Sequence, residues 1–160
     1  MVNVTIICVG KLKEKFYIES CQEYEKRLKG YCKLEICQIN EERLKERPSQ
    51  LEIDGALKKE ADQIVAKIPR GSTVIPMCIE GEQMSSETLA ERFARWTVSS
   101  KPRLCFIIGG SYGLHESVKT VGDERLSMSK MTFPHHLARV MLLEQIYRCF
   151  KIEEGSSYHK

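Results

Sequence analysis

The sequence predicts an α/β protein in which a mostly parallel sheet carries helices on both faces. Short apolar segments rich in β-branched residues alternate with longer segments of helical periodicity along the chain. Such alternation is typical of parallel strands joined by crossover helices. The 160 residues contain no internal repeat, low-complexity segment or interdomain linker, so we expect a single domain over residues 1–160.

Five strands and five helices are expected to alternate from the N-terminus. They are strand 2–9, helix 13–29, strand 33–39, helix 51–68, strand 72–80, helix 85–96, strand 103–110, helix 115–121, strand 124–128 and a final helix that starts at Pro134. The strands are identified by apolar runs or by alternating apolar and polar residues. Pro76, inside the third strand, cannot donate a ladder hydrogen bond, which indicates an edge position or a bulge. The polar region 40–50 is expected to be a mobile loop.

Signals at their ends support the helical segments. Gly30 follows the first helix, Ser49 can cap the second, and Ser85 opens the third. Pro134 suits the first turn of the last helix, where a missing backbone donor is no loss.

The composition excludes several classes of protein. With 42% hydrophobic residues the chain can bury a core, and its net charge of +3 indicates no basic tail. Nucleic-acid binding is compatible with this balance but is not indicated by it. No apolar run reaches the roughly 18 residues of a membrane span, and no basic and apolar leader resembles a signal peptide. We therefore expect a cytoplasmic protein that does not contact a membrane.

The seven cysteines and four histidines predict no metal site. The cysteines are odd in number, form no C-x-x-C pair and lie partly in apolar strand segments. Buried, reduced thiols are therefore expected in preference to disulfides or metal ligands. The histidines do not join them at the spacing of zinc ligands.

A glycine-rich turn is the first candidate for a binding site. The segment FIIGGSYGLHESV (106–118) leads from a strand through Gly109, Gly110 and Gly113 towards a helix. Ligands of open α/β sheets bind at such strand ends, and glycines let the backbone approach them. The spacing matches neither the dinucleotide fingerprint nor a phosphate loop. Because the turn lacks lysine and arginine, it favours a nucleoside-like ligand such as S-adenosylmethionine over ATP or NAD; a tight turn without a ligand is the alternative.

The segment before the last helix has a similar character. Residues 126–133 combine three hydroxyl side chains with Met128, Met131 and Phe133. An adenine ring needs hydrogen bonds at its edge and apolar contact on its faces, which this mixture offers. The alternative is a loop whose methionines and phenylalanine cap the core.

Apolar residues occupy most of the circumference of the last helix. Leu142 and Ile146 belong to one broad arc, whereas Leu137 and Met141 lie on the opposite side. A second buried face indicates contact with another subunit. Arg139 lies within the apolar arc, where it must find a structural partner, extend to solvent or serve a site.

His135 and His136 occupy the first turn of the last helix. The positive end of the helix dipole disfavours a protonated imidazole there, so neutral side chains are expected. One of them could orient a loop or accept a proton, and a structural hydrogen bond is the alternative.

The C-terminal part of the chain carries a local excess of positive charge. Residues 128–151 contain four basic side chains and one acidic side chain. Gly-Ser-Ser then precedes Tyr158, His159 and Lys160, so we expect a flexible tail over 153–160. An aromatic ring, an imidazole and a cation could stack on and contact an RNA base; a frayed terminus is the alternative.

Together, several segments resemble a known family. They are VGKLKEKF, EYEKRL, IEG, IIGGSYGLH, SMSKMTFPHHLARVMLLEQIYR and the final YHK. In this order they are similar to the ribosomal RNA large subunit methyltransferase H family of the SPOUT class. The resemblance implies an α/β-knot fold, a homodimer with its active site near the interface, and S-adenosyl-L-methionine as methyl donor. The implied acceptor is N3 of a pseudouridine in 23S ribosomal RNA, in the hairpin that contacts the small subunit, on assembled ribosomes.

The resemblance also implies roles for individual residues. The cofactor positions are Met77, Gly109, Met128, Ser129, Lys130, Met131, Thr132 and Phe133. The catalytic candidates are Tyr158 and His159, which the family pattern places in the partner subunit's site, together with Arg139. Arg148 and Lys160 are candidates for RNA contacts. Two other functions are weighed against this one: an α/β nucleotide-binding enzyme of another class, and a ribosome-binding factor without catalysis.

Overall fold

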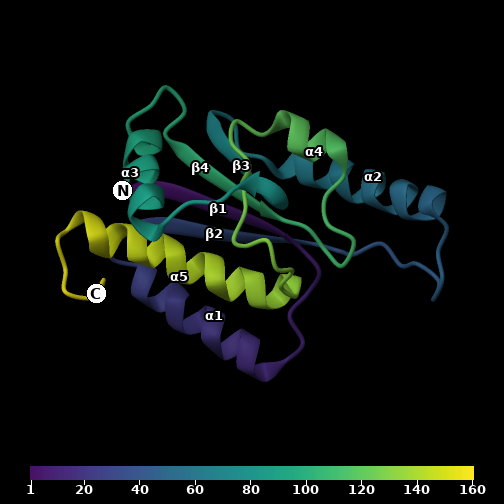
Figure 1. Ribbon diagram of the computed structural model, residues 1–160, viewed down its shortest axis with the longest axis horizontal. Helices are drawn as coiled ribbons and strands as arrows, with labels where there is room; N and C mark the ends of the chain where they lie inside the picture. Colours follow the sequence, from purple (N-terminus) through teal and green to yellow (C-terminus); the bar gives the residue numbers. More distant parts are fainter.

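The computed structural model describes residues 1–160 and contains one sheet of four parallel strands (Figure 1). The strands are β1 (Val2–Val9), β2 (Cys32–Ile39), β3 (Ser72–Glu82) and β4 (Arg103–Ile108). Their order is β2-β1-β4-β3, and every neighbouring pair is parallel. The helices are α1 (Lys15–Leu28), α2 (Gln50–Lys67), α3 (Ser86–Thr97), α4 (Glu116–Val121) and α5 (His135–Glu153).

Helices cover both faces of the sheet, as the sequence predicts. Figure 1 shows α1, α3 and α5 on one side of the sheet and α2 and α4 on the other. The side chains of β1 alternate between two apolar cores: Ile6 packs in the core that contains Leu142, and Ile7 packs in the core that contains Ile64. Because neighbouring strand residues point to opposite faces, β1 is buried from both sides.

Pro76 lies on an edge strand, which confirms that part of the prediction. Pro76 follows Val74 by two residues, so the backbone nitrogens of both point to the same side of β3. The N–H of Val74 donates to Asp123, outside the sheet, at 2.8 Å. The nitrogen of Pro76 therefore faces away from β4, and its missing N–H removes no bond of the ladder. Residues 72–76 pair with residues 103–107 of β4 despite the proline.

The strand expected at 124–128 is wrong. Only Leu126 forms bridges, one with Met77 and one with Glu82, and no continuous ladder follows. Glu82 N–H donates to the carbonyl of Arg125, and its own carbonyl accepts from Ser127 N–H, both at 2.9 Å. A Cβ on Gly81 would lie 2.7 Å from the carbonyl carbon of Leu126. The segment thus contacts β3 through separate bonds instead of a ladder, and Gly81 leaves the room that its close approach requires.

The cysteines are free thiols, as expected, and five of the seven are buried. Burial raises the pKa of Cys8, Cys105 and Cys149 to about 12. The structure contains no group of three or more histidine, cysteine or acidic side chains arranged to hold a metal ion. None of its helices combines the length and the apolar character needed to cross a bilayer.

Candidate cofactor and catalytic site

The glycine turn begins directly after β4. Gly113 N–H donates to the carbonyl of Gly110 at 3.0 Å, and Gly113 has a positive φ of 81°. A Cβ on Gly109 would overlap the carbonyl of Gly113. Two of the glycines are therefore required by the backbone path itself, as the tight-turn alternative predicts.

Glu41, which no pattern in the sequence singles out, supports this turn. Its carboxylate accepts a hydrogen bond from Ser111 N–H at 3.0 Å. A Cβ on Gly110 would lie 2.7 Å from the same carboxylate, so the turn and the loop after β2 are in close contact. The next residue, Glu42, donates its N–H to buried Glu60 of α2 at 2.8 Å.

Parts of the predicted cofactor site lie near the carboxyl end of β4, where its pairing with β3 stops. Pro76 pairs with Ile107, so Met77 lies beside the last residue of β4 and close to Gly109. Met77 and Met128 pack against the same core, and Leu126 forms its bridge with Met77. This edge of an open parallel sheet is where ligands bind in such folds.

The segment Met128–Phe133 is a turn without regular structure. Ser129 Oγ accepts from Met131 N–H at 3.0 Å, and the Ser129 carbonyl accepts from Ser127 Oγ at 3.1 Å. Met131 is 75% exposed, and Lys130, the only charged residue of the segment, is exposed as well. Hydroxyls, thioethers and backbone groups suit an uncharged adenosine moiety, so the residues present fit S-adenosylmethionine.

Arg139 lies in the second turn of α5 and is only 3% exposed. Its Nη2 donates to the carbonyl of Gly10 at 2.9 Å, and its Nη1 donates to Gln38 Oε1 at 3.1 Å. These bonds tie α5 to the carboxyl ends of β1 and β2. Burial, together with neighbouring His136, lowers the pKa of His135, which agrees with the expected neutral ring.

The predicted tail residues form a second cluster, at the C-terminal half of α5. Tyr158 Oη donates to Glu144 at 2.9 Å, and the Arg148 guanidinium lies over the Tyr158 ring and pairs with Glu144 at 2.7 Å. His159 lies between Arg148, at 3.1 Å, and Glu87 of α3, at 2.7 Å. Tyr158, His159 and Arg148 are thus brought together, while Lys160 is exposed at the chain end.

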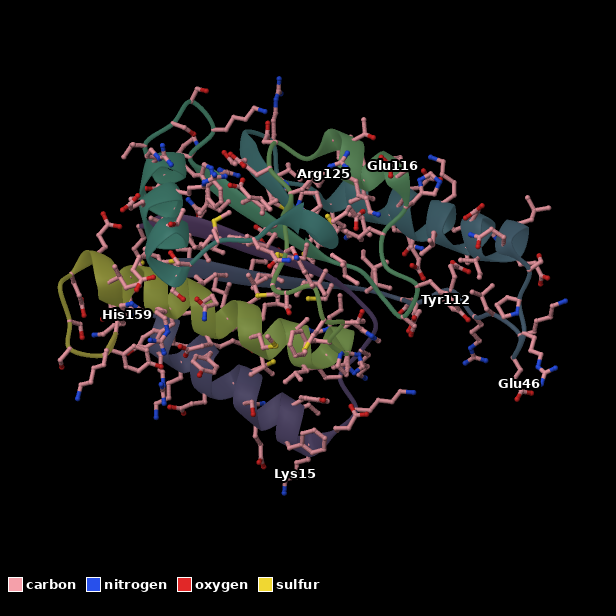
Figure 2. All side chains as sticks on the ribbon, viewed as in Figure 1. Lys15, Glu46, Tyr112, Glu116, Arg125 and His159 are labelled. Atoms are coloured by element: carbon pink, nitrogen blue, oxygen red, sulfur yellow. The ribbon has the colours of Figure 1, made fainter.

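Arg139 and the glycine turn are separated from the tail cluster within one chain. Arg139 and Arg148 are nine residues apart on α5, which corresponds to about 14 Å along the helix axis. Figure 2 shows Tyr112 of the glycine turn and His159 of the tail at opposite sides of the molecule. The predicted catalytic residues Arg139 and His159 therefore do not share one site in a single chain.

Comparison with known proteins decides the family. The family model described as "Predicted SPOUT methyltransferase" matches residues 2–159. This chain belongs to the SPOUT methyltransferase family. It is a methyltransferase that uses S-adenosylmethionine, and its parallel sheet with flanking helices is the SPOUT fold.

Two relatives resemble this SPOUT methyltransferase along its whole length. A protein of Methanococcus maripaludis named "Putative ribosomal RNA large subunit methyltransferase H" is 46% identical over 158 residues, which cover 99% of each chain. The ribosomal RNA large subunit methyltransferase H of Acetivibrio thermocellus is 43% identical over 158 residues, again 99% of each chain. A solved structure described as a probable methylase family protein from Haemophilus influenzae Rd KW20 has a TM-score of 0.56 at 14% identity, over 99% of this chain and 71% of that one.

Proposed function

We propose that this SPOUT methyltransferase methylates N3 of a pseudouridine in 23S ribosomal RNA, in the hairpin that contacts the small subunit, on assembled ribosomes. The observation that carries the proposal is the full-length identity of 46% and 43% to relatives named for large-subunit ribosomal RNA. The choice of N3 and of the hairpin rests on the resemblance of the SKMTFPH segment and the terminal YHK.

The cofactor is proposed to lie against Met77, Gly109 and the run Met128–Phe133. When bound, S-adenosylmethionine supplies a methyl group on a positively charged sulfur, and transfer to a ring nitrogen leaves a neutral thioether. The chain's contribution is to position the acceptor nitrogen in line with that methyl group.

His159 is the proposed acceptor of the proton that N3 loses. A guanidinium can only donate, so His159 Nδ1 accepts from Arg148 and the ring hydrogen of the neutral form lies on Nε2, towards Glu87. Both ring nitrogens are therefore engaged, and His159 can take a proton only after one contact is released. Tyr158 is proposed to orient the acceptor ring.

We propose that the enzyme is a homodimer in which the tail of one chain completes the site of the other. Within one chain the tail lies far from the glycine turn, as Figure 2 shows. Leu137 and Met141 of α5 are only half-buried, which leaves an apolar face for a partner. The knot is proposed from the crossing of Leu126 with the end of β3. Residues 1–160 would then form one domain, with 153–160 as the tail.

The basic candidates receive different roles. Arg148 and Lys160 are proposed to contact RNA phosphate, since Arg148 lies beside the tail and Lys160 ends it. Arg139 is proposed as a positioning residue, because its terminal nitrogens are already bonded to Gly10 and Gln38.

The proposed function is tested on ribosomal RNA from cells that lack this protein. Mass spectrometry of nuclease fragments should show the loss of 14 mass units, about one methyl group, from a pseudouridine in the intersubunit hairpin, and wild-type protein should restore it. Purified protein should methylate assembled ribosomes and not free 23S RNA. An unchanged methylation pattern in the deletion strain would refute the proposal.

A further inference from the structure

A cavity of about 250 Å³ lies between α3, α5 and the segment that leads into the cofactor run. Its apolar wall is formed by Met84, Leu89, Leu126, Met128 and Met141. Met128 belongs both to this wall and to the proposed cofactor segment, so the cavity adjoins the place where the methyl group would be presented. A cavity of roughly 150 Å³ already admits a six-membered ring, so this one has room for a single pyrimidine.

Most polar groups that line the cavity are already engaged. Ser85 Oγ caps α3 by accepting from Thr88 N–H, and Ser127 Oγ donates to the carbonyl of Ser129. Glu144 accepts from Arg148 and from Tyr158. These groups hold the walls in place and offer little to a ligand.

Gln145 is different because one end of its amide is fixed and the other is free. Ser86 Oγ donates to Gln145 Oε1 at 2.7 Å, which fixes the carbonyl end of the amide. The amide nitrogen makes no hydrogen bond in the structure and retains two N–H donors. The cavity therefore presents donors, and no cation, to whatever enters it.

We propose that this cavity takes the acceptor base and that Gln145 recognises a ring carbonyl of a pyrimidine dione. This inference rests on the proposed function, because it assigns the base of the same reaction to a site. Uracil-type rings carry carbonyl acceptors on both sides of N3, whereas cytosine and adenine carry an amino group where a carbonyl is needed. Because Ser86 fixes the Gln145 amide with its N–H donors towards the cavity, the site favours uracil-type rings. The methionine and leucine side chains of the wall would contact the faces of the ring.

The test compares variants on ribosomes purified from a strain that lacks the enzyme, with radiolabelled S-adenosylmethionine. Gln145→Ala should raise KM for ribosomes about 10-fold with little change in kcat, since one neutral hydrogen bond is lost. Gln145→Glu should raise KM for ribosomes further than Gln145→Ala does, because a carboxylate repels the ring carbonyl. Ser86→Ala should raise KM about 3-fold, because the Gln145 amide can then rotate and exchange the positions of its oxygen and nitrogen.

Gln63→Ala, on exposed α2, is the matched control and should behave as wild type. Calorimetry with S-adenosylhomocysteine should give the same affinity for all variants, and sedimentation should give the same oligomeric state. If Gln145→Ala matches Gln63→Ala in KM, or if it changes the oligomeric state, the cavity is not the base site. If the wild-type enzyme itself fails to methylate ribosomes, the proposed function fails, which is a separate outcome.

Discussion

The two ends of α5 are built in different ways. At the N-terminal end, Arg139 is buried against the backbone of Gly10, and the neighbouring turn closes through glycines that admit no side chain. At the C-terminal end, Glu144, Arg148 and His159 meet through side-chain contacts that are partly open to solvent. One end relies on backbone geometry and burial, and the other relies on charged groups.

This difference teaches where the protein should tolerate change. Buried bonds to backbone atoms are expensive to break because the abandoned group cannot reach water. Exposed ion pairs contribute little to stability. Substitutions near the cofactor end should therefore affect folding, whereas substitutions in the tail should affect catalysis and leave the fold intact.

The largest effect is expected at Arg139. Arg139→Ala leaves the Gly10 carbonyl and Gln38 without their partner and opens a cavity, so the free energy of unfolding should fall by about 3 kcal/mol. Chemical denaturation measures this loss. Arg148→Ala is the control at the other end and should cost about 1 kcal/mol or less. Equal losses would remove the contrast between the two ends.

The tail should show the opposite behaviour. Changing Tyr158 and His159 together to alanine should lower the rate of ribosome methylation about 100-fold, because a positioned proton acceptor is lost. The unfolding free energy should stay within about 0.5 kcal/mol of wild type. Calorimetry should show unchanged binding of S-adenosylhomocysteine. Unchanged turnover in this double variant would rule the tail out of catalysis.

A smaller effect on stability is expected at the glycine turn. Gly109→Ala forces a methyl group against the Gly113 carbonyl and should cost about 2 kcal/mol. The cofactor site should be displaced with the turn, so affinity for S-adenosylhomocysteine should drop as well. Gly55→Ala, in the middle of α2 with open space around it, should instead stabilise by about 0.5 kcal/mol.

The smallest effect is a pH dependence at the N-terminal end of α5. Burial lowers the pKa of His135 in the folded protein, so the unfolded chain binds a proton first as the pH falls. Stability should therefore be constant above the ordinary value of about 6.5 and should decline below it. His135→Gln should flatten this decline in denaturation curves recorded from pH 5 to 8. If His135→Gln loses as much stability below about pH 6.5 as the wild type does, groups other than His135 cause the pH dependence.

The sheet could be predicted from the sequence because its signals are local. Apolar runs or alternating residues mark the four strands, and Pro76 indicates an edge position or a bulge, of which the structure has the edge position. The segment 124–128 is not a strand, because buried Leu126 forms only isolated bridges with Met77 and Glu82. Periodicity cannot distinguish a single buried contact from a ladder.

The site was only partly accessible to such reasoning. Arg139 could be identified as unusual, since a charge on an apolar helix face requires a partner. Its partners could not be identified, because Gly10 is 129 residues away along the chain. The same holds for Glu41, which contacts Ser111 across 70 residues and stands in a charged loop without a distinguishing pattern. Gln145 is one of several amides, and only the bond from Ser86 sets it apart.

The buried cysteines can report when the folded protein opens, because they become reactive only on exposure to solvent. The thiolate is the form of cysteine that attacks an alkylating reagent, and burial suppresses this form in the folded state. A maleimide pulse should therefore modify the half-buried Cys37 and Cys78 first and reach the other five only when the cores come apart. Peptide mapping of the modified cysteines over time would then measure how often each face of the sheet is uncovered, because Cys8 and Cys149 lie in one core and Cys105 lies in the other.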